Sequence, residues 1–565
     1  MNSTNMKNRI IIIVLAVFSM ISFSSCSDFL DLKSNDIITG DALSEENLEA
    51  LTAPLYNYAW YEFNWRFNIA AGDAMSFNLE HNADYYGDFT YFTFSTSTSS
   101  LGPGWGSLYA VVQSANKVIV TVNSVNISES QKAPYIAEAR FMRGLAYWYL
   151  ASLWYNVVIS DDPTPLVNDP IVNTNPKKDV YEFAIRDMEY AAKYLPETSQ
   201  ATGRVNRYSA FGMLSRFYLA YSGYVASNYG ENPNIGKRDQ GYLDMAKKAA
   251  EKVIQSGKFK LMDNYYDLFT IEKNNNSESL FSFQWVPGLN GNSNYGLTNG
   301  AVSNLAGVGL ASAGEAWGSW SNATYNMMKE YESDDILRRY ATWMGAGDFY
   351  PDLNTAEGGL RIGNGDGEYN MGHNSIYNNC LCIKKGVTGN AKDNPAINTR
   401  NSGLDNAMLR YAEVLLNYAD AVLGNSASTS DAAAMQYFNA VRTRAEMSEK
   451  SSIGYEDLRH ERRIEFCMEG LYWYDLMARA YYQQQEVINF LIAQNRGSQP
   501  AFLFDAPMNL RLDPDRNPGS HAIGEIKASS FKLSYPAGEI LQNPKLADAP
   551  VPYTFTEDRI TDLFN

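Results

Sequence analysis

The chain has 565 residues, of which 45% are hydrophobic, and its formal net charge is −17 with a pI near 4.8. This length allows two or more domains or one large helical array, and the hydrophobic content excludes a disordered chain. Because such an acidic chain offers no basic surface, its composition argues against nucleic acid and anionic lipid as partners and favours neutral ligands. The 39 Tyr and 10 Trp supply many aromatic rings, which fill cores and also form binding surfaces.

The first residues follow the pattern of a secretory signal. A basic start precedes an apolar run over residues 10–23, and small residues then lead to Cys26. This pattern predicts a signal peptide over residues 1–25, too short to span a membrane comfortably, with a cysteine placed as in a bacterial lipobox. We therefore expect Cys26 to be lipidated as the first mature residue, with residues 26–44 as a tether.

Residues 45–276 are predicted to form an α-helical scaffold. Its most apolar segment, residues 132–158, contains one glycine and an early Pro134, which predicts a long helix that neighbours cover on several sides. Further helices are predicted over residues 44–61, 105–122, 178–195, 207–224 and 242–256. Paired helices of this kind, with small and aromatic residues alternating, are typical of tetratricopeptide-like stacks.

Two regions interrupt the helical pattern. In residues 63–94, rings alternate with hydrogen-bonding side chains at neither helical nor strand spacing, which favours a surface loop. Residues 277–404 are rich in Gly and Asn and carry scattered Trp and Tyr, with a helical piece over residues 323–340. A long irregular insertion in a helical scaffold is usually functional, so we expect the ligand surface in this insertion.

The two irregular regions hold the candidate binding residues. A sugar ring stacks its apolar C–H face on an aromatic plane, and its rim of hydroxyl groups requires Asp, Asn or Arg. The ring candidates are Trp317, Trp320, Tyr295, Trp285, Trp65, Tyr85 and Tyr86, and the hydrogen-bonding candidates are Asp73, Asn78, Arg361, Asn364 and Asp366. Burial is the competing interpretation of each ring, because most Trp side chains fill cores.

Residues 405–565 return to helices, including one over residues 431–447, and end in a tail. Four motifs run through the chain: AEARFMR from Ala137, LRYAEVLL from Leu409, ERRIEF from Glu461 and YPAGEI from Tyr535. In this order and spacing they resemble the RagB/SusD family of Bacteroidetes outer-membrane glycan-binding lipoproteins.

The resemblance implies a mainly α fold: a tetratricopeptide-like helical-pair scaffold with a large loop-rich insertion. It also implies a cell-surface protein of the outer membrane that captures glycan without catalysis and serves as a lid on a SusC-like TonB-dependent transporter. The motif residues Glu413, Glu461, Arg463, Glu465 and Asp475 are expected to form salt bridges between helices, because no histidine or nucleophile accompanies them.

Two other classes of protein stay open from the residues alone. A glycoside hydrolase needs only two carboxylates, which 63 acidic residues can supply, although no catalytic motif singles out a pair. A helical scaffold for protein interaction would need no glycan affinity. Cys380, Cys382 and Cys467 are expected to be mostly buried or loop thiols without a disulfide framework. No metal site or cofactor is predicted, although a structural calcium ion is possible.

Overall fold

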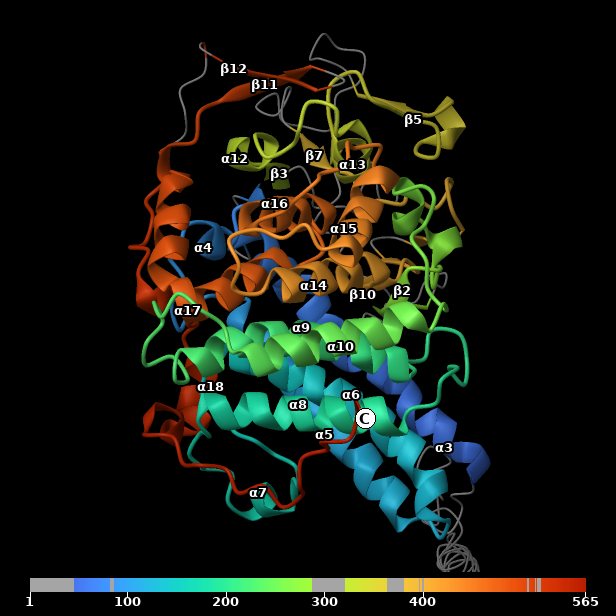
Figure 1. Cartoon of the computed structure of the whole chain (residues 1–565), viewed down its shortest axis with the longest axis vertical. Coiled ribbons are helices and arrows are strands. Elements are labelled where there is room, and N and C mark those ends of the chain that lie inside the picture. Colours follow the sequence, from blue (N-terminus) through green and yellow to red (C-terminus); the bar gives the residue numbers. More distant parts are fainter. Residues whose placement is uncertain are drawn as a thin grey trace, which may run out of the picture.

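The structure, a computed structural model, describes residues 45–81, 86–286, 321–362, 381–395, 397–398, 401–505, 508–513, 515 and 520–564. Helices dominate these residues (Figure 1), which confirms the prediction of a mainly α protein. The longer helices are α3 (Glu45–Thr52), α5 (Leu101–Ser124), α6 (Glu129–Trp154), α8 (Lys177–Tyr194), α9 (Arg207–Ala226), α10 (Gln240–Gln255), α14 (Tyr411–Leu423), α15 (Ala432–Arg444), α16 (Tyr455–Glu465) and α17 (Tyr472–Ala493). The shorter ones are α4 (Gly87–Thr90), α7 (Thr164–Asn168), α12 (Tyr325–Met328), α13 (Ile336–Thr342) and α18 (Ala537–Gln542).

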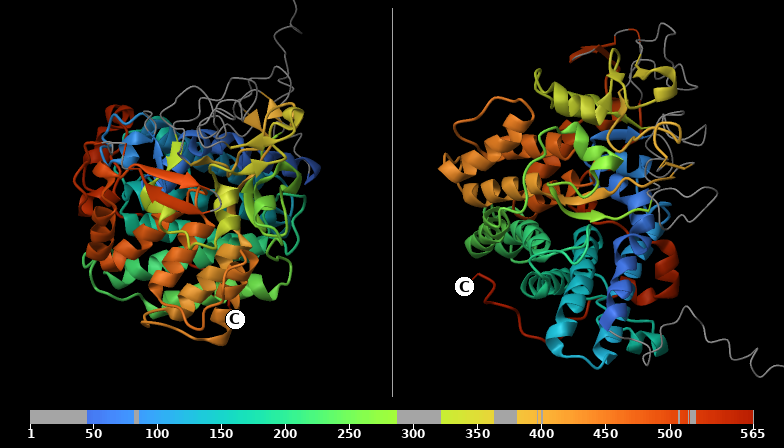
Figure 2. Two further views of the ribbon diagram at one scale, coloured as in Figure 1. Left: turned by 90° about the horizontal axis from the view of Figure 1, so that it is seen from above. Right: turned by 90° about the vertical axis from the view of Figure 1, so that its right-hand side faces the viewer.

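Successive helices pack against one another as a stack. Helix α5 contacts α6, α6 contacts α8, α8 contacts α9, α9 contacts α10, and α10 contacts α14. Helix α14 also packs on α15 and α16. Figure 1 shows α8, then α9 and α10, then α14 as layers along the long axis of the molecule. In the right-hand view of Figure 2, the N-terminal segments in blue lie on one side of this stack and α14 to α16 in orange on the other. A scaffold of helical pairs, as predicted, is therefore what the sequence forms.

Helix α6 is the central helix of the scaffold. It begins at Glu129, earlier than the expected start near Pro134, because the Gln131 side chain accepts a hydrogen bond from the Ser128 N–H and caps the helix. Neighbours cover almost all of its second half. Its Arg143 donates to both carboxylate oxygens of Asp187 on α8, at 2.7 and 2.8 Å, so the buried charge is paired.

Short strands add small sheets to the helical scaffold. The four-stranded sheet has the order β1 (Leu79–His81), β3 (Ser321–Ala323), β7 (Cys382–Ile383) and β4 (Trp343–Met344). Antiparallel pairs are formed by β2 (Ser279–Phe283) with β10 (Asn406–Arg410), β5 (Phe349–Tyr350) with β6 (Leu360–Arg361), β8 (Ile397–Asn398) with β9 (Asn401–Ser402), and β11 (Phe502–Asp505) with β12 (Asn509–Leu512). Figure 1 places α12, α13, β5 and β7 together with β11 and β12 at one end of the stack.

Three local predictions were wrong. The expected helix over residues 44–61 ends at Thr52, because Pro54 has no N–H to continue an α-helical ladder. Residues 323–340 form two short helices, α12 and α13, in place of one. The helix expected from residue 405 begins at Tyr411, because the preceding residues pair with β2 as strand β10.

The expected surface loop over residues 63–94 is largely an interior segment. It contains the π-helical turns η4 (Phe63–Phe67) and η5 (Ala70–Ala74), and η5 is buried throughout. A Cβ atom added at Gly72 would lie 2.3 Å from the backbone of Gly470, so the two segments touch through their backbones. A π-helical turn is closed by i→i+5 hydrogen bonds and contains more residues than an α-helical turn, so residues in η4 and η5 need not follow a period of 3.6.

A network of buried ion pairs joins the insertion to the C-terminal helices. Glu461 of α16 binds Arg442 of α15 at 2.9 Å and also Arg338 of α13, which itself pairs with Asp335. Glu465 binds Arg410 of β10 at 3.0 Å, and Arg410 binds Glu278 beside β2 at 2.9 Å. The predicted structural role of the motif charges is thus confirmed for Glu461 and Glu465. Glu413, Arg463 and Asp475 also form ion pairs, with Arg216, Glu330 and Arg462 respectively.

The C-terminal tail returns to the first helical pairs. Arg559 binds Glu189 of α8 at 2.7 Å, and Glu557 binds Arg140 of α6 at 2.6 Å. Further inward, Leu533 N–H donates to the Leu153 carbonyl at 2.8 Å. The C-terminal tail therefore packs against α6 and α8 and covers part of their surface.

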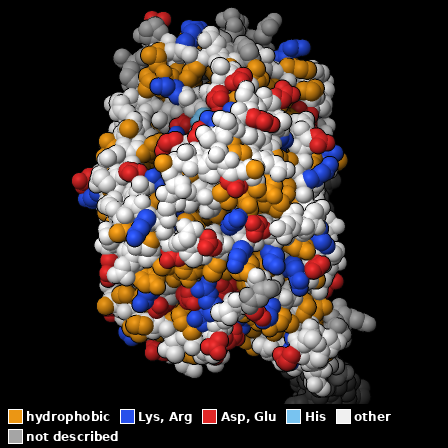
Figure 3. Space-filling view, in the orientation of Figure 1, with side chains coloured by type: hydrophobic (Ala, Val, Ile, Leu, Met, Phe, Trp, Pro, Cys, Tyr) orange, Lys and Arg blue, Asp and Glu red, His pale blue; other side chains and the backbone are white. Residues whose placement is uncertain are grey.

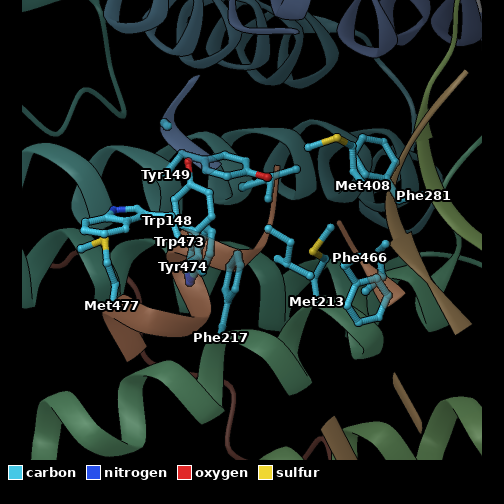
Figure 4. Packing of buried hydrophobic residues seen from close by; sticks show 14 of the residues in the cluster. Trp148, Tyr149, Met213, Phe217, Phe281, Met408, Phe466, Trp473, Tyr474 and Met477 are labelled. Carbon is cyan, nitrogen blue, oxygen red and sulfur yellow. The ribbon is translucent and has the colours of Figure 1, made fainter. Parts of the chain in front are cut away.

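The core is one large aromatic and aliphatic cluster, part of which Figure 4 shows. Trp148 stacks on Phe217 with ring centroids 5.3 Å apart, which joins α6 to α9. Cys382 and Cys467 are buried, as expected, and Cys380 lies outside the described residues. Within the described ranges, no helix is both long and apolar enough to cross a membrane. Acidic and basic side chains alternate over the face shown in Figure 3.

Candidate functional site

Trp65 is the described ring candidate that remains partly exposed. It lies in η4, where its ring centroid is 5.5 Å from that of Tyr61. The guanidinium carbon of Arg66 lies 3.9 Å from the Trp65 ring centroid, which is a cation–π distance. These two contacts hold the orientation of the indole while part of it faces solvent.

Trp285 lies close by, at the end of β2, but it is only 5% exposed. Its Nε1–H donates to Asn406 Oδ1 at 2.8 Å, and its backbone N–H donates to Asp405 Oδ1 at 3.0 Å. Its ring centroid is 6.4 Å from that of Tyr61. The structure thus brings Trp65 and Trp285 together around Tyr61, although Trp285 is an interior ring that supports this cluster and is not an open stacking surface.

A pocket lies near this aromatic cluster, although none of the three rings lines it. Asn64, the neighbour of Trp65 in η4, lines it together with Asn406, the partner of Trp285. Asn68, Asp405, Lys385 and Glu469 add further polar groups, and Ile69, Phe269, Leu404, Ala407, Met408 and Met468 add apolar ones. We refer to Tyr61, Trp65 and Trp285 with this cavity as the aromatic cleft.

Asp405 is an unusual carboxylate in the aromatic cleft. Burial raises its pKa to about 7, and the hydrogen bonds from the Trp285 N–H and the Asn275 amide only partly offset this effect. A carboxyl group with such a pKa both donates and accepts hydrogen bonds near neutral pH. Asn64 and Asn406 place two further amide side chains in the lining of the same pocket.

Asp73, Asn78 and Tyr86 are not surface groups, which corrects their assignment as ligand contacts. Asp73 accepts hydrogen bonds from the N–H groups of Met468 and Gly470 at 2.9 and 2.7 Å, and Asn78 donates to Asp73 at 2.8 Å. Burial raises the pKa of Asp73 to about 6 against these hydrogen bonds. Tyr86 is also fully buried. These polar groups connect η5 to the turn after α16, so they stabilise the fold.

The other candidates fall elsewhere. Arg361 is exposed on β6, where its guanidinium lies 4.3 Å from the Phe349 ring in the β5–β6 hairpin, apart from the aromatic cleft. Outside the described residues lie Trp317, Trp320, Tyr295, Tyr85, Asn364, Asp366 and the lipidation candidate Cys26. No group of three or more His, Cys, Asp or Glu side chains is arranged to hold a metal ion in the part of the chain that the structure describes.

Sequence reasoning missed Asn64, Asn68, Asp405 and Asn406. The signal that could have found the last two is their place: they directly precede the Leu409 motif at the end of the irregular insertion. Asn64 in η4 and Asn68 directly after it carried no such signal, because Asp405 and Asn406 in the same lining lie more than 300 residues further along the chain.

Comparison with known proteins identifies the class to which this fold belongs. A SusD superfamily protein of Parabacteroides distasonis has the same fold, with a TM-score of 0.67 at 20% identity over 89% of this chain and 98% of that one. A structure solved with xylogluco-oligosaccharide matches more closely, with a TM-score of 0.80 at 35% identity over 90% of this chain and 100% of that one.

Sequence comparison then assigns the family. The model of the SusD family matches residues 191–506, and a second model, described as starch-binding and associating with the outer membrane, matches residues 28–219. A SusD-like protein of Bacteroides ovatus is 35% identical over 98% of this chain and 99% of its own length. The chain belongs to the SusD family, and the resemblance found in its motifs is confirmed.

Proposed function

We propose that this protein binds a neutral oligosaccharide or polysaccharide without cleaving it. The observation that carries the proposal is the structure solved with xylogluco-oligosaccharide. That chain is 35% identical to this one over 90% of this chain and 100% of its own length. Xyloglucan is therefore the first polymer to test. The low isoelectric point supports a neutral ligand, because an acidic protein repels polyanions.

The aromatic cleft supplies the chemistry that sugar binding needs. Trp65 offers a partly exposed indole whose orientation Tyr61 and Arg66 fix before a ligand arrives. A fixed ring loses little conformational entropy on binding, so more of the stacking energy appears as affinity. Asn64, Asn406 and Asp405 line the neighbouring pocket and carry polar groups that suit the hydroxyl groups of a sugar.

Replacement of Trp65 with alanine is expected to weaken glycan binding at least about tenfold, because the ring's stacking and burial energies are lost. Affinity gel electrophoresis across neutral polysaccharides, followed by calorimetric titration with xyloglucan fragments, measures the change. The matched control is Tyr194→Ala, which removes a 39% exposed ring at the end of α8 and should leave affinity unchanged.

The possible results separate the site from the function. Unchanged affinity in Trp65→Ala would discard the aromatic cleft as the binding site while the function stands. If the wild-type protein binds no neutral glycan, the proposed function fails and a scaffold for protein interaction takes its place. Release of reducing sugar by the wild-type protein would instead identify a glycoside hydrolase.

We further propose that Cys26 carries a lipid that anchors the protein at the outer surface of the outer membrane, where it delivers glycan to a SusC-like TonB-dependent transporter. The signal pattern before Cys26 supports the anchor, and the family model described as associating with the outer membrane supports the location. A lid that opens and closes over a transporter would account for capture and release without chemistry.

Labelling with an alkyne fatty acid tests the anchor. The wild-type protein is expected to be labelled and to sediment with membranes, whereas Cys26→Ala should lose nearly all label and become soluble. Cys382→Ala is the matched control, because its thiol is buried and should not affect labelling. Label that persists in Cys26→Ala would contradict the assignment. Copurification of a TonB-dependent transporter with the detergent-solubilised wild-type protein tests the partner.

A further inference from the structure

A groove of about 400 Å³ runs beside strand β2 and shares no lining residue with the pocket of the aromatic cleft. The loop between α8 and α9 forms one wall, and residues 275–282, which include most of β2, form the other. A strand rises about 3.3 Å per residue, so the four β2 residues in this wall extend over about 10 Å, which is longer than one sugar ring. We refer to this space as the polar groove.

The lining of the polar groove is rich in neutral hydrogen-bonding side chains. Two of its three charged side chains form ion pairs, Glu197 with Arg207 at 3.3 Å and Arg204 with Glu138 at 2.9 Å. A groove lined by hydroxyl and amide groups suits a neutral ligand that carries many hydroxyl groups. The lining residues of this kind are Thr198, Ser199, Thr202, Asn206, Asn275, Asn276, Ser277, Ser279 and Ser282.

Two hydroxyl groups of the polar groove are held by neighbours that donate to them. Thr198 Oγ1 accepts a hydrogen bond from Lys258 Nζ at 3.0 Å, and Ser199 Oγ accepts one from Asn206 Nδ2 at 3.1 Å. Each hydroxyl group can still donate its own hydrogen. A sugar hydroxyl donates and accepts as water does, so it replaces water there without leaving a group unpaired. The partly buried ring of Phe259 adds an apolar surface for the C–H face of a sugar.

Asn275 connects the polar groove to the aromatic cleft. It lines the groove, and its amide donates at 3.1 Å to Oδ2 of Asp405, which lines the pocket of the aromatic cleft. The same amide donates at 2.8 Å to Oε1 of Gln284, the residue before Trp285. Figure 1 shows β2 and β10 side by side, and residues of β2 line the groove while residues of β10 line the pocket. The two sites are therefore neighbours in the fold.

We propose that the polar groove is a second glycan subsite, which binds further units of the chain held at the aromatic cleft. The inference rests on the proposed function and adds the class of ligand: an extended polysaccharide chain, in preference to a single sugar or a short fragment. Once the first subsite holds a chain, the second meets the rest of that chain at a high effective concentration. Affinity therefore increases when a fragment is long enough to reach both subsites.

Calorimetric titration with xyloglucan fragments of two lengths, with about four and about eight sugars in the backbone, tests the proposal. If xyloglucan is not bound, fragments of a neutral polysaccharide that the affinity gels retain take its place. The wild-type protein is expected to bind the longer fragment at least about tenfold more tightly than the shorter one. Equal affinities for the two lengths would overturn the inference and leave the proposed function intact. If the wild type binds no neutral glycan at all, the proposed function fails as well.

A double variant locates the second subsite. Thr198→Val with Ser199→Ala removes two hydroxyl groups from the polar groove, so it should weaken binding of the longer fragment about tenfold and leave the shorter one unaffected. The matched control, Ser451→Ala with Ser452→Ala, removes two exposed hydroxyl groups that line neither site and should bind as the wild type does. Trp65→Ala, by contrast, should weaken both fragments. Unchanged affinity for the longer fragment in the groove variant, or an equal loss for both lengths, would also overturn the inference.

Discussion

Glu465→Gln is expected to lower the free energy of unfolding by about 3–5 kcal/mol, because it removes one countercharge that three buried arginines share. Glu465 is fully buried, pairs with Arg410 at 3.0 Å and also contacts Arg444 and Arg338. The glutamine keeps the shape and removes only the charge. Urea unfolding of the two proteins, followed by tryptophan fluorescence, measures the difference.

The loss should depend on pH in a defined direction. Burial alone would raise the pKa of Glu465, but the surrounding guanidinium groups outweigh it and lower the pKa to about 2. A lowered pKa stabilises the folded state above the unfolded value of about 4.3, and this stability is lost as pH falls toward 2. The difference in the free energy of unfolding between the wild type and Glu465→Gln should therefore be largest near pH 6 and should decrease below about pH 4.

Glu525→Gln is the control for this effect. Glu525 is 74% exposed and pairs only with Lys527, so its loss should change stability by less than about 0.5 kcal/mol. An equal, small effect at both positions would show that the buried network is not what joins the insertion to the C-terminal helices.

Gly72→Ala is expected to destabilise the protein by about 3 kcal/mol or more, because the new methyl group would meet the backbone of Gly470 at 2.3 Å. Backbone cannot move aside as a flexible side chain can. A shift of η5 would also lengthen the hydrogen bonds that Asp73 accepts from the N–H groups of Met468 and Gly470. The midpoint of thermal or urea unfolding reports the loss.

Gly106→Ala provides a glycine control with the opposite expectation. Gly106 is exposed within α5, and a Cβ atom there meets nothing within 4 Å. Alanine favours a helix over glycine, so this variant should be as stable as the wild type or gain up to about 1 kcal/mol. If both substitutions shift the midpoint alike, the close approach of Gly72 and Gly470 does not contribute to stability.

The sequence predicts structure best where the residues of one element are enough to determine its conformation and burial. The apolar run around Phe141 predicts a covered helix whatever its neighbours are, and the charges of the Glu461 motif sit on a helix crowded with rings, which requires ion pairs. A buried arginine such as Arg143 requires a partner, and Asp187 provides it. In each case burial limits the chain to one solution.

The sequence predicts structure least well where contacts between distant segments determine the conformation or the burial of a residue. Asp73 and Asn78 have the composition of a ligand site, yet their partners at Met468 and Gly470 are almost 400 residues away and take them into the interior. Residues 406–410 read as helix until β2 is known to lie beside them. The aromatic cleft draws on η4, β2 and β10, so no single stretch of sequence describes it.

The return of the tail to α6 and α8 has a consequence for how the protein is made. Arg140 meets Glu557, a partner 417 positions later, and Glu189 meets Arg559 at a comparable separation. While the chain is being synthesised, α6 and α8 lack the C-terminal tail that later covers them. Their polar groups and rings are exposed until that tail has been made. Complete packing of α6 and α8 therefore requires residues that are synthesised much later, and contacts between such distant residues slow folding.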